Sequence, residues 1–309
     1  MDYTLLLIVV LLVVIGLVIL YSTSAYNGQV KFHDSFYYLK KQAFATVLGI
    51  VLMLFVAGMD YHIWQRLAVF GYLAAVALSA AVMLFGREIN GSKRWLALGP
   101  FSFQPSEFAK VALILFLADL VTKNVKTIGK MWTLCRIMFW ILPIVGLVGA
   151  SNLSTAIIIL GIGVILIFVA SPKYAQFALM GIAGACFMGI FLALESYRLE
   201  RLAIWRNPEK YEKGYQTLQG LYAIGSGGVF GVGIGNSVQK LGFVPEAQND
   251  MIFSIICEEL GIFGGLIVLM LYAYLLYRLF VIAQNAPDMF GSLMVSGIFI
   301  HIALQVILN

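Results

Sequence analysis

Long apolar runs constrain this chain more than any other feature. The first, YTLLLIVVLLVVIGLVILY, begins at Tyr3 and is long enough to span a bilayer rather than to be removed as a signal peptide. A membrane-spanning helix needs about 20 apolar residues. Such runs cover residues 4–24, 39–58, 63–85, 107–122, 153–170, 174–195, 252–280 and 291–308, and a shorter run covers 137–150. The sequence predicts an all-α, polytopic transmembrane helical bundle with nine visible spans, the fifth kinked at Pro143.

The composition supports a membrane protein and excludes several kinds of site. Apolar residues make up 61% of the chain and charged residues 11%, whereas soluble domains are about 45–50% apolar. The cysteines and histidines are scattered, without CxxC or HExxH spacing, so they predict neither a disulfide framework nor a zinc site. These residues are Cys135, Cys186, Cys257, His33, His62 and His301.

The two longest loops, 86–106 and 196–250, fall on the same face of a nine-span bundle. Twelve of the 20 lysines and arginines lie on that face and seven on the other. Taken literally, the positive-inside rule makes the long-loop face cytoplasmic. Six of the twelve charges lie in one loop near the length at which the rule weakens, so orientation stays open. A basic face suits an anionic lipid headgroup such as a pyrophosphate, and a solvated charged rim is the alternative.

Loop 86–106 leads into a helix that carries two charges near its start. Gln104-Pro105-Ser106-Glu107 is typical of a helix N-terminus, with proline at the boundary and an acid in the first turn. Lys110 follows Glu107 by three residues, so both project from one helical face and can pair. Capping explains Glu107 but not a lysine one turn deeper in the apolar phase. A structural ion pair and a substrate-facing site remain as explanations.

Loop 196–250 begins with an amphipathic segment and continues into a glycine-rich one. The first part interleaves basic and apolar side chains, which is typical of a segment lying on the headgroup layer. These side chains are Tyr197, Arg198, Arg201, Leu202, Trp205 and Arg206. GSGGVFGVGIGNS, from Gly225, contains six glycines but no nucleotide-binding pattern. Its glycines suit close backbone approach to a ligand or a re-entrant turn.

Four acids crowd the start of the eighth span. Asp250 lies where the apolar run begins and could be an N-cap for a helix over 251–280. Glu258 and Glu259 lie about 12 Å further along that helix, so they must meet polar partners inside the bundle, because a membrane-embedded charge is expensive. Capping leaves Glu246, Glu258 and Glu259 unexplained. A polar cavity opening to the long-loop face accounts for all four.

Three blocks of this sequence resemble the SEDS family, which includes FtsW, RodA and SpoVE. They are NGSKRWLALGPFSFQPSEFAK, GYQTLQGLYAIGSGGVFGVGIGNS and QKLGFVPEAQNDMIFSIICEELG. The first apolar run is also similar to the family's first helix, and the PEA sequence leans toward FtsW or SpoVE. The resemblance implies a ten-helix peptidoglycan glycosyltransferase of the bacterial cell membrane that polymerises lipid II during division or sporulation. The long-loop face, including loop 196–250, would then be extracellular.

The resemblance also assigns roles to residues. Asp250 takes the place of the catalytic aspartate, a general base for the acceptor hydroxyl with undecaprenyl pyrophosphate as leaving group. The candidate substrate-binding residues are Arg94, Glu107, Lys110, Arg198, Arg201 and Glu246. Expected partners are lipid II, membrane lipid and a class B penicillin-binding protein, with no nucleic acid. No cofactor is certain, and a divalent cation such as magnesium is the candidate.

The chain departs from the family pattern in two places. Asn152 stands where the family usually has an aspartate, in a Gln-Pro-Asp-Leu-Gly-Thr segment. The chain also stops at HIALQVILN, before the family's tenth helix, so we expect a single SEDS-type domain over 1–309 that is truncated. A lipid II flippase and a non-catalytic scaffold for a cell-wall synthase are the alternative functions.

Overall fold

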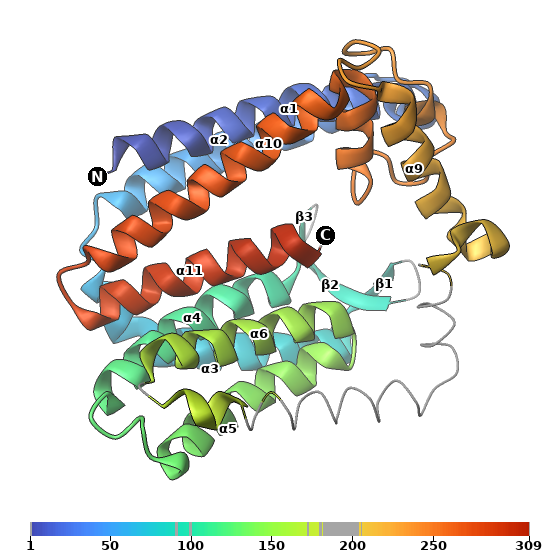
Figure 1. The fold of residues 1–309 in the computed structure, drawn as a ribbon. Coiled ribbons are helices and arrows are strands. Elements are labelled where there is room, and N and C mark those ends of the chain that lie inside the picture. The colour runs from blue at the N-terminus through green and yellow to red at the C-terminus, as the bar shows by residue number, and fades with distance from the viewer. Residues whose placement is uncertain are drawn as a thin grey trace. The chain divides into compact units, whose positions relative to one another are not determined.

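The computed structural model describes residues 2–89, 92–98, 101–171, 173–178, 181, 204 and 206–308. The chain divides into two compact units. The first unit comprises residues 1–58 and 182–275, and the second comprises residues 59–181 and 276–309. Figure 1 labels the helices and strands of each unit.

The second unit is built around the buried helix α4. Its elements in chain order are α3 (His62–Phe85), β1 (Arg87–Ile89), β2 (Ser92–Leu98), β3 (Phe101–Phe103), α4 (Pro105–Asn124), α5 (Met131–Gly149), α6 (Leu153–Ala170) and α11 (Met289–Leu308). Helices α3, α5, α6 and α11 all contact α4. A Cβ on Gly297 of α11 would come within 2.4 Å of Ile114 of α4. This glycine therefore permits the close helix approach that is common inside membranes.

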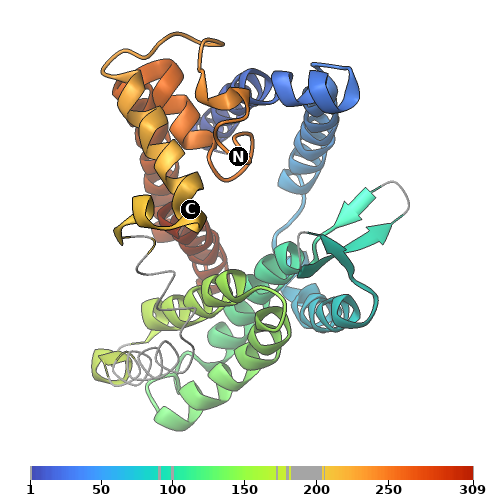
Figure 2. The same ribbon diagram turned by 90° about the vertical axis from the view of Figure 1, so that its right-hand side faces the viewer.

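A small antiparallel sheet connects α3 to α4, with strand order β1-β2-β3. Trp95 pairs with Arg87, and Leu96 pairs with Phe103. Strand β2 contacts α3 and α4, so the sheet lies at the ends of these helices (Figure 2). The sequence predicts a loop here rather than a sheet, although aromatic and branched residues in this segment favour strands.

The first unit contains two long helices and the segments that lead into a third. Its elements are α1 (Tyr3–Phe32), α2 (Tyr37–Ala57), η1 (Pro208–Lys210), η2 (Glu212–Gly214), α9 (Tyr215–Gly227), η3 (Gln239–Leu241) and the first part of α10 (Ile252–Gln284), which continues into the second unit. Helix α1 contacts α2. A small apolar core joins α9, the segment before α10 and α10 itself. It consists of Ala223, Val244, Ala247 and Ile255, with Met251 packed against it.

The helical prediction is confirmed for eight of the nine expected spans. Helices α1, α2, α3, α4, α5, α6, α10 and α11 match them, and most of the expected span 174–195 lies outside the described residues. Among the described residues, seven helices are long and apolar enough to cross a membrane. Helix α4 is not one of the seven, because it carries Glu107, Lys110, Asp119 and Lys123.

The exposed surface of the helices is suited to lipid. Helix α2, which the structure describes in full, has no buried residue although its side chains are mainly apolar. Phe44 and Phe55 are 63% and 68% exposed. Apolar side chains in such number on a helix surface are stable when hydrocarbon surrounds them. The chain is therefore a multi-pass membrane protein.

Candidate functional site

Helix α10 is interrupted at Gly261, which has φ 70° and ψ −173°. The residues after α9 supply hydrogen bonds on both sides of the break. Val232 N donates to Glu258 O at 3.0 Å, and Gly233 N donates to Glu259 O at 2.9 Å. Ile262 N donates to Gly228 O at 3.0 Å. The interrupted backbone is thus satisfied within the protein, as backbone at membrane depth requires.

Glycines allow the segment after α9 to approach the backbone of α10 closely. A Cβ on Gly227 would lie 2.0 Å from Cys257 O, and one on Gly231 would lie 2.2 Å from Glu259 O. Gly231 also has a positive φ of 79°, a conformation that suits glycine. The sequence predicts close approach to a ligand or a re-entrant turn. The structure shows that the approach is to the backbone of α10.

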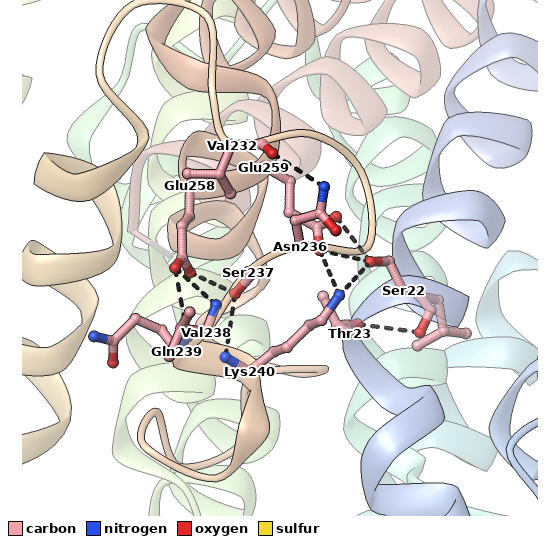
Figure 3. Close-up of polar contacts among 11 residues, drawn as sticks. Ser22, Thr23, Val232, Asn236, Ser237, Val238, Gln239, Lys240, Glu258 and Glu259 are labelled. Carbon is pink, nitrogen blue, oxygen red and sulfur yellow. Dashed lines mark hydrogen bonds and ion pairs between the residues drawn. The ribbon is translucent and has the colours of Figure 1, made fainter.

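The Glu258 carboxylate holds the segment that contains η3 (Figure 3). It accepts hydrogen bonds from Val238 N at 3.0 Å and Gln239 N at 3.4 Å. The Ser237 hydroxyl donates to the same carboxylate. Glu258 is 3% exposed, so these groups replace the water that a buried carboxylate loses.

Glu259 is buried in an ion pair (Figure 3). Lys240 Nζ lies 2.7 Å from Glu259 Oε1, and the two side chains are 7% and 0% exposed. Ser22 Oγ of α1 donates to Glu259 at 2.6 Å and accepts from Lys240 Nζ at 3.0 Å. The prediction that Glu258 and Glu259 meet polar partners inside the protein is confirmed.

Glu246 and Asp250 have a different environment, because both are exposed. Glu246 has a positive φ of 53° and accepts a hydrogen bond from Asn249 Nδ2 at 2.6 Å. The prediction of one polar cavity for all four acids is wrong. Two of them are buried by the chain's own groups, and two face outward.

The capping role considered for Asp250 is not found either. Helix α10 begins at Ile252, two residues later. Within the described part of the chain, the Asp250 carboxylate has no hydrogen bond or ion pair. It is therefore a carboxylate whose oxygens are available to a ligand.

The main chain around Asp250 is well anchored. Ala247 is fully buried and Val244 is 3% exposed, both in the small apolar core. Asn27 of α1 donates to Gln248 Oε1 at 3.1 Å. The exposed carboxylate of Asp250 thus follows a segment held to α1 and α10.

In the second unit, the predicted pairing of Glu107 with Lys110 is confirmed. Lys110 Nζ lies 2.8 Å from Glu107 Oε2. The lysine side chain is 1% exposed and the glutamate side chain 54%. Lys110 therefore cannot be a surface contact, whereas Glu107 remains open to a ligand.

Arg94 and Asn152 lie near each other in the second unit. Arg94 is exposed, and its Nε donates to Ser151 O at 3.4 Å. Arg94 and Asn152 both line a small pocket with Ser79 and Ser106. Asn152 is the N-cap of α6, and its Oδ1 accepts from Thr155 N at 3.2 Å. An asparagine caps a helix as well as an aspartate does, so Asn152 in place of the family's aspartate is compatible with the start of α6.

Two predicted substrate-binding residues, Arg198 and Arg201, lie outside the described residues. Asp250 and Glu246 belong to the first unit, and Arg94, Glu107 and Lys110 to the second. Among the described residues, no group of three or more histidine, cysteine or acidic side chains could hold a metal ion.

A second polar cluster lies at the end of α3 opposite the sheet. The Tyr61 hydroxyl donates to Asp288, which raises the pKa of Tyr61 to about 12 and lowers the pKa of Asp288. His62 Nε2 lies 3.4 Å from Asp288. The neighbouring carboxyl of Asp60 has a lowered pKa because it accepts hydrogen bonds from His62.

Sequence reasoning misses Ser22, Ser237 and Lys240. In the sequence, Lys240 is only one of several loop charges, and Ser22 is only part of the first apolar run. The one signal that could have found them is the unmatched pair of acids at Glu258 and Glu259, which requires polar partners. Which partners these are depends on the tertiary fold.

Comparison with known proteins agrees with the predicted family. The family described as "Cell cycle protein", represented by FtsW, RodA and SpoVE, matches residues 3–309. Stage V sporulation protein E of Bacillus subtilis (strain 168) is 38% identical, over 100% of this chain and 86% of that protein. A probable peptidoglycan glycosyltransferase FtsW of Thiomicrospira cyclica is 35% identical, over 100% of this chain and 81% of that protein.

This chain is also similar to a solved structure. It is described as "Structural coordination of polymerization and crosslinking by a peptidoglycan synthase complex" and matches with a TM-score of 0.81 and 30% identity. The match covers 99% of this chain and 85% of the solved one. The chain therefore belongs to the FtsW/RodA/SpoVE family of cell cycle proteins.

Proposed function

We infer that this chain is a peptidoglycan glycosyltransferase that polymerises lipid II, with Asp250 as its general base. A relative is named a probable peptidoglycan glycosyltransferase FtsW. The assignment of the base rests on the environment of the Asp250 carboxylate. Its carboxylate is exposed and without a partner in the described part of the chain, although the segment that leads to it is anchored by buried groups.

The reaction needs a base at this position. The 4-hydroxyl of the acceptor sugar attacks the anomeric carbon of the donor, and the bond from that carbon to undecaprenyl pyrophosphate breaks. A sugar hydroxyl is a weak nucleophile until its proton is removed, and a positioned carboxylate contributes about 100- to 10,000-fold. Asp250 accepts that proton, and the pyrophosphate leaves with the bonding electrons.

The substrate's charge accounts for the basic residues. Arginine's planar fork suits a pyrophosphate, so Arg94, Arg198 and Arg201 bind the diphosphate in this proposal. Glu107 and Glu246 are exposed and accept hydrogen bonds from the sugar or peptide. Lys110 is buried and acts by holding Glu107. With lipid II on this side, loops 86–106 and 196–250 face the outside of the cell.

A partner enzyme belongs to this proposal. The solved structure with a TM-score of 0.81 is described as coordinating polymerisation and crosslinking in a synthase complex. A polymerase of this family produces uncrosslinked glycan strands. We therefore propose a class B penicillin-binding protein as the partner that crosslinks them.

Asp250→Asn tests the base directly. The amide retains the shape of the side chain and loses its basicity, so folding and lipid II binding should be intact and polymer should be absent. Purified wild-type and variant proteins are compared by gel analysis of glycan strands, and by lipid II binding. Full polymerisation by the variant would refute the assignment of the base. Transport of lipid II by both proteins, without polymer from either, would favour a flippase.

A further inference from the structure

Lys240 and Glu259 form an ion pair that the proposed reaction does not use. The side chains are 7% and 0% exposed, and Lys240 Nζ lies 2.7 Å from the carboxylate. Neither group can touch a substrate, so neither is a catalytic residue. Their effect on the reaction must pass through another residue.

The pair connects three segments that are distant in the sequence. Ser22 is in α1, Lys240 is in η3, and Glu259 is in α10 before its break. The Ser22 hydroxyl bonds both charged groups, with distances of 2.6 Å to Glu259 and 3.0 Å to Lys240. Figure 3 shows the three side chains converging from their separate elements.

Stability alone does not explain such a pair. Apolar residues of similar volume often stabilise a fold as well as a buried ion pair does, whereas removal of one partner is strongly destabilising. In some proteins a buried polar or ionic group instead fixes one register over its alternatives. In this protein the pair fixes the position of the segment from η3 to the start of α10 against helices α1 and α10.

That segment leads directly to Asp250. Glu258 binds the main chain at Val238 and Gln239, just before Lys240. Val244 N donates to Gln239 O at 2.9 Å, which closes the turn after η3. The next firm contact is the buried Ala247, three residues before Asp250. The anchors at η3, together with the buried Ala247 and the bond from Asn27 to Gln248, therefore hold the segment that carries Asp250.

We propose that Lys240, through Glu259 and Ser22, is a positioning residue for Asp250. The inference rests on the proposed function, because it takes Asp250 as the base and assigns the positioning of that residue to the ion pair. The pair sets the turnover number, since a displacement of about 1 Å can lower a rate about 100-fold. It has a smaller effect on lipid II affinity, because Glu246 is the only proposed binding residue in this segment.

The test removes both charges together. Lys240→Met with Glu259→Gln leaves no unpaired buried charge, and the amide introduced by Glu259→Gln can still accept a hydrogen bond from Ser22. The control is Lys123→Met with Asp119→Asn, which removes a pair of 2.6 Å in α4 whose aspartate is 4% exposed and whose lysine is 64% exposed. We expect the test variant to lose about 10- to 100-fold in kcat, with a smaller change in KM. The control should equal wild type in both constants.

A spin label at position 250 provides a readout that does not depend on activity. It is attached through Asp250→Cys in a chain whose native cysteines are replaced by alanine. Electron paramagnetic resonance should show a more mobile label in the test variant than in the wild-type background or the control. A loss of stability alone would lower the folded yield without changing the spectrum of the folded protein.

An unchanged spectrum, or wild-type kcat per folded molecule, would overturn the proposal. If the test variant does not fold, Ser22→Ala serves instead, because it leaves the ion pair in place. It should lower kcat and mobilise the label, and an unchanged kcat and spectrum would again overturn the proposal. Polymerisation by Asp250→Asn would refute the base alone, because the label would still report whether Lys240 holds this segment.

Discussion

Gly231 and Gly261 lie backbone to backbone at the break in α10. A Cβ on Gly261 would lie 2.5 Å from Gly231 N, and one on Gly231 would lie 2.5 Å from Gly261 N. Both residues have positive φ, 79° and 70°. This mutual contact lets the loop after α9 reach the free main-chain groups of the broken helix.

Gly261→Ala should therefore destabilise the protein. A backbone at φ 70° and ψ −173° is essentially restricted to glycine and costs another residue about 1–3 kcal/mol. The Cβ would also lie 2.3 Å from Val229 O. Gly49→Ala in α2 is the control, since a Cβ there meets no atom within 4 Å and alanine favours a helix. Thermal unfolding in detergent should show a lower Tm for Gly261→Ala only. Equal Tm values for both variants would contradict the contact.

The pair of Glu107 and Lys110 should respond asymmetrically to mutation. Glu107→Ala leaves Lys110 charged at 1% exposure, a loss of about 3–5 kcal/mol for an uncompensated buried charge. Lys110→Met leaves Glu107 charged but exposed to water, so it should destabilise less. The double variant should be more stable than additive effects predict, as measured by folded yield and thermal unfolding. Strictly additive effects would exclude coupling between the two residues.

Arg94→Ala should weaken lipid II binding more than Lys126→Ala does. The only described contact of the Arg94 guanidinium is a long hydrogen bond to Ser151 O, so its removal should leave the fold intact. Hydrogen bonds to a charged group contribute about 1.5–3 kcal/mol, which corresponds to a rise of about 10- to 100-fold in KM. Lys126, exposed in the turn between α4 and α5, controls for loss of a positive charge. Equal KM values for the two variants would mean that Arg94 does not bind the substrate.

The bond from Tyr61 to Asp288 should give a pH-dependent contribution to stability. The raised pKa of Tyr61 means that its contribution is complete below pH 10.0 and is lost as pH rises through about 12. The lowered pKa of Asp288 means that its contribution is present above about pH 4 and is lost as pH falls through the lowered value. The difference in Tm between wild type and Tyr61→Phe should therefore be largest near neutral pH.

The measurement is a Tm series over pH in one detergent. Asp60 and its hydrogen bonds from His62 are present in both proteins, so the comparison isolates the Tyr61 hydroxyl. Tyr61→Phe keeps the ring that stacks on Phe290 and removes only the hydroxyl. A difference in Tm that is constant from acid to alkaline pH would contradict the role of this bond.

Local signals in the sequence determined the membrane class and part of the site. Apolar runs of about 20 residues identify spanning helices because lipid leaves the backbone no other partner. The spacing of Glu107 and Lys110 was enough to predict their pairing, since residues three apart share a helical face. The three motif blocks identified the family and pointed to Asp250.

Only the tertiary structure decided how the four acids near α10 differ. Glu258 and Glu259 are adjacent in sequence but bind different groups. Glu258 binds main-chain N–H groups at Val238 and Gln239, whereas Glu259 binds Lys240 and Ser22 of α1. Asp250 and Glu246 stay exposed because the apolar core holds Ala247 between them instead. The break at Gly261 also escaped prediction, since a glycine within an apolar run is compatible with an unbroken helix. Its conformation is fixed by the contact with Gly231, thirty residues away in the sequence.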